Sequence, residues 1–191
     1  MKTLKYILKK YQLKPKMASP IRLNIKRYQM NHLFKELGFS KGAEIGVARG
    51  HFSEELCRVN PNLKMHCIDI WADPDKTIFA EAKKRLAPLN CKLIRKSSME
   101  AVKEFAPQSL DFVYIDGDHR YQQVLKDLTA WSKIVRPDGI VSGHDYLTFK
   151  HPEIGVPVKR AIDRYIRNLQ IKRLFLVNKN NQSNWFFIKE G

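Results

Sequence analysis

The sequence lacks long hydrophobic runs and any pattern of paired cysteines. No apolar stretch in its 191 residues approaches the roughly 20 that a membrane-spanning helix needs, and lysines interrupt the apolar residues of MKTLKYILKKYQL at the N-terminus. The three cysteines, Cys57, Cys67 and Cys91, form no C-x-x-C pair, and their odd number argues against a disulfide framework. We therefore expect a cytoplasmic protein with reduced thiols in or near its core.

Acidic residues are scarce at both ends of the chain. Residues 1–40 contain ten Lys or Arg and one acidic residue, and residues 159–191 contain eight basic and two acidic residues. Residues 41–158, with 17 basic and 16 acidic residues, are nearly neutral, so the net charge of +16 belongs to the two ends. Such ends are suited to nucleic acid, anionic lipid or a phosphorylated substrate, and a merely solubilising surface is the alternative.

The composition is that of an ordinary globular protein, with 43% hydrophobic and 28% charged residues and no internal repeat. Residues 1–26 read as a basic N-terminal extension, because a short amphipathic helical pattern ends there at the two prolines of KPKMASP. Residues 27–191 are long enough to form one domain with its own core.

Strand-like apolar runs alternate with amphipathic helical patterns through most of the chain. This alternation predicts β-α-β units, and hence a parallel sheet with helices on both faces. A helix predicted at about residues 155–168 is followed by two further strand-like runs that are joined by the turn formers NKNNQS, which indicates an antiparallel hairpin. The predicted strands cover residues 43–47, 64–70, 91–95, 111–116, 138–145, 171–177 and 184–190.

The segment AEIGVARGHFSEEL has the pattern of a strand, a glycine-bearing turn and a helix. Its glycines, Gly46 and Gly50, follow Glu44 as E-x-G-x-x-x-G, which is neither the dinucleotide-binding G-x-G-x-x-G nor a P-loop. A carboxylate at this place would repel a pyrophosphate but would suit a ligand that carries positive charge. A tight turn that binds no ligand is the alternative.

Polar residues also end the next two predicted strands. Asp69 follows the glycine turn by about 20 residues, a spacing at which an acid accepts hydrogen bonds from ribose hydroxyls. Ile70 and Trp71 come next, and a large side chain there can pack on an adenine. Ser97 or Ser98 opens the following helix, where a helix cap is the plainer interpretation. The carboxyl ends of these strands meet at one edge of a sheet.

These residues resemble those of class I S-adenosylmethionine-dependent methyltransferases, over residues 40–190. The resemblance implies an α/β Rossmann-like fold with a seven-stranded mixed sheet, in the strand order 3-2-1-4-5-7-6. It also implies S-adenosylmethionine as the cofactor. The residues that it assigns to the cofactor are Glu44, Gly46, Val47, Gly50, Asp69, Ile70, Trp71, Ser97, Ser98 and Asp116.

Three further segments, FVYIDGDHRYQQVLKDLTAW, RPDGIVSGHDY and HPEIGVPVKRAID, resemble the small-molecule O-methyltransferases that include macrolide-sugar and catechol-type enzymes. This likeness implies a divalent cation, commonly Mg²⁺, held by Asp116, His144 and Asp145. It also implies that His119 takes the proton of a sugar or phenol hydroxyl. A hard cation prefers oxygen ligands and lowers the pKa of a bound hydroxyl, and an imidazole is suited to accept a proton near pH 7.

The sequence departs from this group at His144, where the relatives have an acidic ligand. An imidazole makes the site softer, so Mn²⁺, Fe²⁺, Zn²⁺, the absence of a metal, or a second base at His144 all stay open. Asp118 is interpreted as a cap of the helix that follows it and not as a ligand. Trp131 and Tyr121, on that amphipathic helix, are expected in the core.

Two other functions are consistent with the basic ends. The first is methylation of RNA, although the sequence has no N/D-P-P-Y-type motif and no recognisable RNA-binding module. The second is a non-catalytic module that keeps the fold and docks on a polyanion or a membrane. The expected partner is a small-molecule acceptor, and a homo-oligomer stays open.

Overall fold

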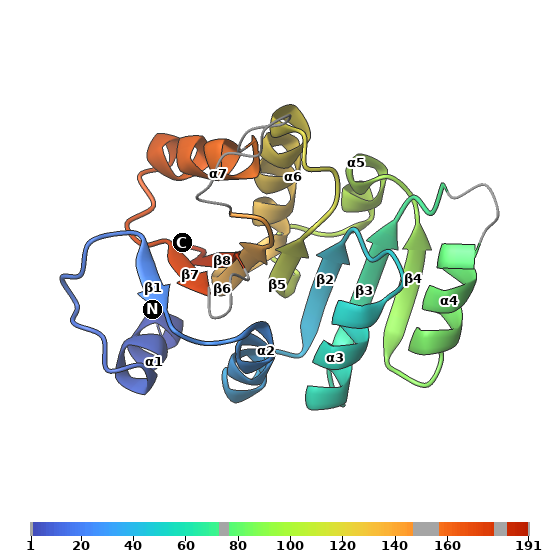
Figure 1. The fold of residues 1–191 in the computed structure, drawn as a ribbon, viewed down its shortest axis with the longest axis horizontal. Helices are drawn as coiled ribbons and strands as arrows, with labels where there is room; N and C mark the ends of the chain where they lie inside the picture. The colour runs from blue at the N-terminus through green and yellow to red at the C-terminus, as the bar shows by residue number, and fades with distance from the viewer. Residues whose placement is uncertain (1, 73–76, 147–156, 178–182, 191) are drawn as a thin grey trace.

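The computed structural model describes residues 2–72, 77–146, 157–177 and 183–190 (Figure 1). They form one sheet of eight strands in the order β1-β7-β8-β6-β5-β2-β3-β4. The central strands are parallel, and β8 is antiparallel to both of its neighbours, β6 and β7. The strands are β1 (Ile21–Leu23), β2 (Lys41–Ile45), β3 (Lys64–Asp69), β4 (Cys91–Arg95), β5 (Leu110–Ile115), β6 (Val135–Gly143), β7 (Phe175–Val177) and β8 (Asn184–Ile188).

The seven strands predicted from the sequence are β2 to β8. Read from β4 to β7, the observed order is the predicted 3-2-1-4-5-7-6, and the terminal hairpin is antiparallel as expected. The fold is therefore the Rossmann-like α/β fold that the resemblance implies. The additional strand, β1, pairs in parallel with β7, with Ile21 opposite Phe175.

Helices cover both faces of the sheet (Figure 1). One face packs against α1 (Lys2–Lys10), α2 (Arg27–Glu36), α3 (His51–Val59) and α4 (Thr77–Leu86). The other packs against α5 (Ser98–Ala101), the 3₁₀ turn η1 (Val102–Glu104), α6 (Tyr121–Ile134) and α7 (Pro157–Asn168). The predicted helix over 155–168 is α7, and its first two predicted residues lie outside the described part of the chain.

The central strands are apolar on both faces because both faces are covered. In β5, Phe112 and Tyr114 pack in the core beneath α2 and α3, whereas Val113 and Ile115 pack beneath α6. Such continuous apolar runs are typical of parallel sheets between two helical layers. The predicted core position of Trp131 on α6 is confirmed, since its side chain is fully buried.

The N-terminal segment is in contact with the rest of the molecule. Ile7 of α1 and Ile21 of β1 are buried in the core. The Thr3 hydroxyl donates a hydrogen bond of 2.7 Å to the carbonyl oxygen of Asp138 in β6. None of the described helices is long and apolar enough to cross a membrane.

The register of the sheet brings the carboxyl ends of four strands to one edge. Ile45 of β2 lies opposite both Ile68 of β3 and Ile115 of β5, and Ile115 lies opposite Gly143 of β6. Residues that directly follow these strands therefore emerge side by side. In open α/β sheets ligands bind at this edge.

Candidate functional site

A cavity of about 590 Å³ opens at this edge of the sheet. Its walls come from the residues that end β2, β3, β4 and β5, together with the first two turns of α6. A volume in the range of roughly 300–1,000 Å³ is usual for small-molecule sites. Six of the residues predicted to contact a cofactor line it: Gly46, Asp69, Ile70, Ser97, Ser98 and Asp116.

The glycine turn after β2 forms one wall. Gly46 has a φ of 87° and Gly50 a φ of 80°, a region that favours glycine. Gly50 is the N-cap residue of α3, as the sequence pattern of strand, turn and helix predicts. Val47 between them is buried in the core, and neither Val47 nor Gly50 is among the residues that line the cavity.

Glu44 points away from the cavity into the core. Its carboxyl group accepts a hydrogen bond from the Ser53 hydroxyl of α3, and its side chain is buried. Burial raises the pKa of Glu44 well above its ordinary value, and the hydrogen bond from Ser53 only partly opposes this effect. In this arrangement Glu44 fixes α3 against β2 and does not line the cavity.

Asp69 organises the second wall. Its two carboxylate oxygens accept backbone N–H groups of Ala48 and Trp71, each at 2.9 Å, and so tie the end of β3 to the glycine turn. The Trp71 indole donates to the carbonyl of Ala48 at 2.8 Å and is only 2% exposed. Ile70, 57% exposed, is instead the apolar side chain that faces the cavity.

The third wall begins α5. Ser97 caps this helix, because its hydroxyl accepts the N–H of Glu100. Ser98 has a different environment: its hydroxyl donates to Asp127 at 2.5 Å and accepts from the Trp131 indole at 2.8 Å. Asp127 is itself buried, and burial raises its pKa.

Asp127 and its partner Gln123 line the cavity, although the sequence did not single them out. The Gln123 amide donates to Asp127 at 3.0 Å. Their only sequence signal is the i, i+4 spacing of two polar side chains on a helix whose other face is core, which also describes an ordinary solvent-exposed face. The exposed Arg120 lines the cavity too, and no pattern marks it.

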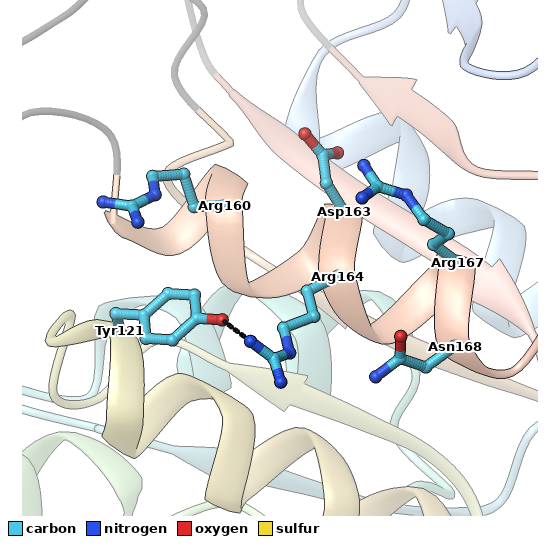
Figure 2. Close-up of a pocket in the computed structure, with 6 residues that line it drawn as sticks. All are labelled: Tyr121, Arg160, Asp163, Arg164, Arg167 and Asn168. Carbon is cyan, nitrogen blue, oxygen red and sulfur yellow. Dashed lines mark hydrogen bonds between the residues drawn. The ribbon is translucent and has the colours of Figure 1, made fainter.

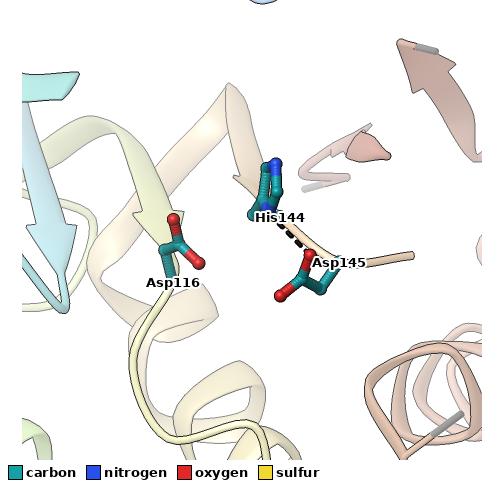
Figure 3. Close-up of side chains that lie close together, drawn as sticks. All are labelled: Asp116, His144 and Asp145. Atoms are coloured by element: carbon teal, nitrogen blue, oxygen red, sulfur yellow. Dashed lines mark ion pairs between the residues drawn. The ribbon is translucent and has the colours of Figure 1, made fainter. Parts of the chain in front are cut away.

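Asp116, His144 and Asp145 are brought together beside this cavity (Figure 3). One ligand atom from each lies within 4.8 Å of the others, and all three residues are half-buried. Two carboxylates and one imidazole at this separation form a donor set that suits a divalent cation. These are the three residues that the resemblance assigns to a metal.

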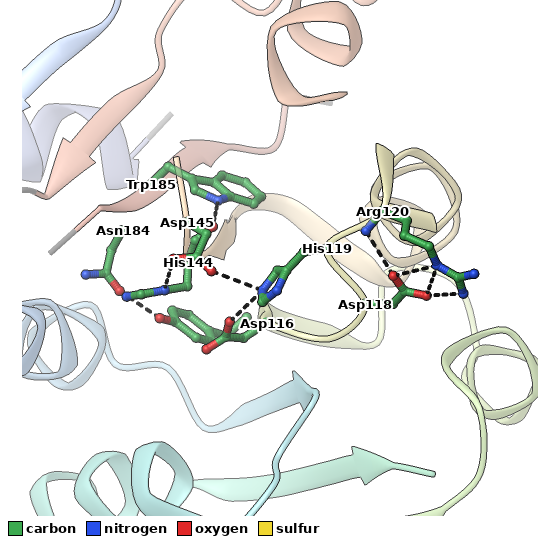
Figure 4. Close-up of polar contacts among 9 residues, drawn as sticks. Asp116, Asp118, His119, Arg120, His144, Asp145, Asn184 and Trp185 are labelled. Atoms are coloured by element: carbon green, nitrogen blue, oxygen red, sulfur yellow. Dashed lines mark hydrogen bonds and ion pairs between the residues drawn. The ribbon is translucent and has the colours of Figure 1, made fainter. Parts of the chain in front are cut away.

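His119 faces the same two carboxylates (Figure 4). Its Nε2 atom lies 3.4 Å from Asp116 Oδ1 and 3.2 Å from Asp145 Oδ2. The hydrogen bond with Asp116, followed by the charge of Asp145, raises the pKa of His119. The carboxylates thus favour positive charge between them, which a protonated imidazole or a cation supplies.

His144 and Asp145 form a pair of their own. His144 Nδ1 lies 2.7 Å from Asp145 Oδ1, and this contact raises the pKa of His144 and lowers the pKa of Asp145. The backbone is held as well, since the Trp185 indole donates to the carbonyl oxygen of His144 at 2.9 Å (Figure 4). Asp145 itself has a φ of 58°, a left-handed conformation.

The predicted cap at Asp118 is wrong in position. The N-cap residue of α6 is Arg120, and Asp118 lies two residues earlier. Its carboxylate accepts the backbone N–H of Arg120 at 2.9 Å and pairs with the Arg120 guanidinium (Figure 4). A short Asx turn thus precedes the helix, a local arrangement that aspartate favours as readily as a cap.

The fold and the cavity define a Rossmann-like α/β protein with a ligand site at the carboxyl ends of its strands. The model of a family described as a methyltransferase domain matches residues 43–146, just over half of the chain, so the protein belongs to this methyltransferase family. The match includes the glycine turn, Asp69 and the cluster of Asp116, His144 and Asp145.

Solved structures share the fold at low sequence identity. The O-methyltransferase TomG from Streptomyces achromogenes, involved in tomaymycin synthesis and solved with SAM, is 17% identical, with a TM-score of 0.68 over 100% of this chain and 91% of that one. A proposed rRNA methylase from Clostridium thermocellum is 14% identical, with a TM-score of 0.64 over 87% and 98%.

Among curated proteins, an uncharacterized protein of Acanthamoeba polyphaga mimivirus is 30% identical over 64 residues. The matched stretch is 34% of this chain and 28% of that protein. The chain therefore spans little more than a quarter of the curated relative that it matches.

Proposed function

We propose that the protein transfers the methyl group of S-adenosylmethionine to an oxygen of a small hydroxylated acceptor, a sugar or a phenol, with the assistance of a divalent cation. One observation carries this proposal: Asp116 both lines the cavity and belongs to the cluster with His144 and Asp145. A cofactor in the cavity and an acceptor at the cluster would meet at this side chain, as methyl transfer requires.

The cavity has the parts that an S-adenosyl ligand needs. The Asp69 carboxylate keeps free lone pairs for ribose hydroxyls, and Ile70 offers an apolar surface to the adenine. The carboxylate of Asp116 favours the positive charge of the sulfonium. The TomG structure, solved with SAM in the same fold, supports this choice of cofactor.

The cluster has the parts that an acceptor hydroxyl needs. Asp116, His144 and Asp145 would hold the cation, which supplies a positive charge that orients the acceptor oxygens and lowers the pKa of the hydroxyl. His119, whose imidazole is half-exposed at 45%, can reach an acceptor and remove its proton. Its carboxylate partners then stabilise the resulting imidazolium. Because His144 is a softer ligand than a carboxylate, a first-row transition metal such as Mn²⁺, Fe²⁺ or Zn²⁺ is favoured over Mg²⁺ at this cluster.

Calorimetric titration of S-adenosylhomocysteine into the protein, in EDTA and then with Mn²⁺ or Mg²⁺, tests both parts. We expect micromolar binding that Asp69→Asn weakens at least tenfold, because the ribose loses its charged acceptor. A separate Mn²⁺ titration should give a binding heat that Asp116→Asn abolishes. The matched variant Asp118→Asn, two residues away and outside the cluster, should keep that heat.

Each result has a clear counterpart. If S-adenosylhomocysteine does not bind under any condition, the methyltransferase assignment of this site is refuted. If Asp116→Asn keeps the heat of Mn²⁺ binding, the cation does not sit at the cluster. If the protein is a non-catalytic module, the His119→Ala variant keeps its function. If His119 is the base, the rate of methyl transfer in this variant falls by roughly 100-fold or more.

Methylation of RNA is the second candidate. The basic ends favour it, as does the similarity in fold to the proposed rRNA methylase. Incubation with labelled S-adenosylmethionine and total RNA distinguishes the two. Label in the RNA, together with salt-sensitive and saturable RNA binding, would show that the methyl acceptor is RNA and not a small molecule.

A further inference from the structure

A second cavity, of about 390 Å³, lies between the outer surfaces of α6 and α7 (Figure 2). It is polar, and its lining includes three arginines of α7 and a tyrosine of α6, toward which Arg164 points. No step of the methyl transfer described above uses it. Its lining residues are Tyr121, Arg160, Asp163, Arg164, Arg167 and Asn168.

The arginines share one face of α7 because of their spacing. Arg160, Arg164 and Arg167 stand at positions i, i+4 and i+7, which lie above one another on a helix. The opposite face is apolar and buried, as Val158 and Ile162 show. Over these seven residues the helix rises about 10 Å, so the three arginines form a row along this face of α7.

The positive charge of this row is not compensated within the described residues. Arg160 lies over the Tyr121 ring at 5.4 Å, and Arg164 donates to the Tyr121 hydroxyl at 3.4 Å. Among residues 2–72, 77–146, 157–177 and 183–190, no carboxylate forms an ion pair with any of the three arginines. The ring and the hydroxyl of Tyr121 thus contact Arg160 and Arg164 without neutralising their charge.

The one acid of the cavity is already paired. Asp163 accepts the Tyr146 hydroxyl at 2.7 Å through Oδ1 and pairs with Lys159 at 2.5 Å through Oδ2. Its charge is therefore balanced by Lys159, four residues earlier on the same helix. Asp163 therefore does not balance the charge of the three arginines, and no other carboxylate among the described residues lines the cavity.

The walls of this cavity continue from the candidate active site. Tyr121 begins α6 directly after the loop that carries Asp116 and His119. Tyr146, which holds Asp163, directly follows Asp145. Both segments that present the acceptor site thus lead along the chain to a residue that lines this cavity or contacts its lining.

We propose that this arginine-lined cavity binds a phosphate group carried by the methyl acceptor. The guanidinium group is planar and forms two parallel hydrogen bonds with a phosphate, which makes arginine better suited to it than lysine. A neutral acceptor would leave these exposed guanidinium groups without a counter-charge, so the row favours phosphorylated acceptors over neutral ones. The inference rests on the proposed function, and it narrows the acceptor from hydroxylated molecules to phosphorylated ones.

Inorganic phosphate is the probe, titrated into protein saturated with S-adenosylhomocysteine and followed calorimetrically at constant ionic strength. We expect saturable binding of phosphate whose affinity Arg164→Gln and Arg167→Gln each weaken at least fivefold. Arg164→Lys should weaken the affinity less, because lysine keeps the positive charge but cannot form two parallel hydrogen bonds. The matched control is Lys133→Gln, which removes one exposed positive charge at the far end of α6 and should leave the affinity within twofold.

Three results would overturn the proposal: no saturable binding of phosphate, equal weakening by Lys133→Gln, or no weakening by either arginine variant. A 20-nucleotide single-stranded RNA is the second ligand. If the arginine variants lose RNA binding while inorganic phosphate neither binds nor competes, the row serves a nucleic-acid backbone and the proposal is wrong. Because S-adenosylhomocysteine binding is measured first in the same sample, failure of the proposed function is seen separately from failure of this site.

Discussion

At the scale of single residues, Gly46 shows how closely the two halves of the site approach each other. A Cβ atom at this position would lie 2.3 Å from the carbonyl oxygen of Asp116 and 2.5 Å from the Cα atom of Gly117. The chain after β2 therefore contacts the chain after β5 backbone to backbone. Only glycine allows this contact at a φ of 87°.

Gly46→Ala should lower the free energy of unfolding by about 2–4 kcal/mol, since it adds a left-handed alanine and a backbone clash. Gly38→Ala is the matched control. Gly38 has a φ of 71° with no atom within 4 Å of the added Cβ, so it isolates the conformational cost of about 1 kcal/mol. Urea unfolding of the three proteins measures the difference. Equal losses in the two variants would mean that the strand ends can move apart.

The site residues differ in how well a sequence predicts them. Asp69 and Asp116 were predictable because each ends an apolar run, and parallel strands bring their carboxyl ends to one edge. The orientation of Trp71 was not predictable. Its φ of 41° turns the indole onto the Ala48 carbonyl and leaves Ile70 to face the cavity. The sequence gives no signal for such a backbone conformation at a non-glycine residue.

At the scale of the elements, Asp111 holds three strands together where they begin. Its carboxylate accepts the backbone N–H groups of Ser40 and Lys41 at 2.7 and 2.9 Å, at the start of β2. It also accepts the Arg136 guanidinium of β6 at 2.7 Å. Burial alone would raise the pKa of Asp111, but these hydrogen bonds outweigh it and hold the pKa below its ordinary value.

Because its pKa is lower in the folded protein than in the unfolded chain, the Asp111 carboxylate contributes stability above the unfolded pKa of about 4. This contribution is lost as the pH falls through the folded pKa. Asp111→Asn should therefore cost about 1–3 kcal/mol at pH 7, and the difference from the unsubstituted protein should shrink below about pH 4. Denaturant unfolding across this pH range measures it.

The control for Asp111 is Asp118→Asn, which removes an aspartate that pairs with a largely exposed arginine. We expect Asp118→Asn to lower the free energy of unfolding by about 0–1 kcal/mol, as for other surface ion pairs. A loss at Asp111 that is no larger, or one that stays constant down to pH 3, would contradict the role given to the three strand contacts.

Strand β1 is the element that the sequence did not predict. Three residues, Ile21–Leu23, are too few to show the alternation of a strand, and their partner β7 lies at the other end of the chain. The long runs of β2 to β6 were predictable from their local pattern. Pairing between the two termini depends on contacts that no local pattern encodes.

At the scale of the whole molecule, the two basic ends of the chain lie at the same end of the sheet, where β1 and β7 pair. Helix α1 lies on one face of the sheet and α7 on the other. The chain between them, nearly neutral, forms the cavity and the cluster. A polyanion or a phosphorylated acceptor would therefore meet one charged half of the molecule.

The division into an extension (residues 1–26) and a domain (residues 27–191) can be tested by deleting the extension. Ile7, Ile21 and Leu23 are at most 3% exposed, and each buried aliphatic side chain contributes roughly 1.5–3 kcal/mol. Their joint loss approaches the roughly 5–15 kcal/mol that keeps a typical domain folded. We therefore expect residues 27–191 alone to melt well below the full chain or to aggregate.

Two single substitutions in α1 compare a buried with an exposed side chain in this test. Ile7→Ala should cost about 2–5 kcal/mol, whereas Tyr6→Ala, on the neighbouring and exposed position of α1, should cost much less. Thermal unfolding followed by circular dichroism compares all four proteins. If residues 27–191 fold with an unchanged melting temperature, the extension is separable, as the sequence alone predicts, and the burial of Ile7 adds nothing to stability. If they do not, the N-terminal 26 residues are part of the folding unit, because β1 covers the edge of β7 and α1 covers the core beneath it.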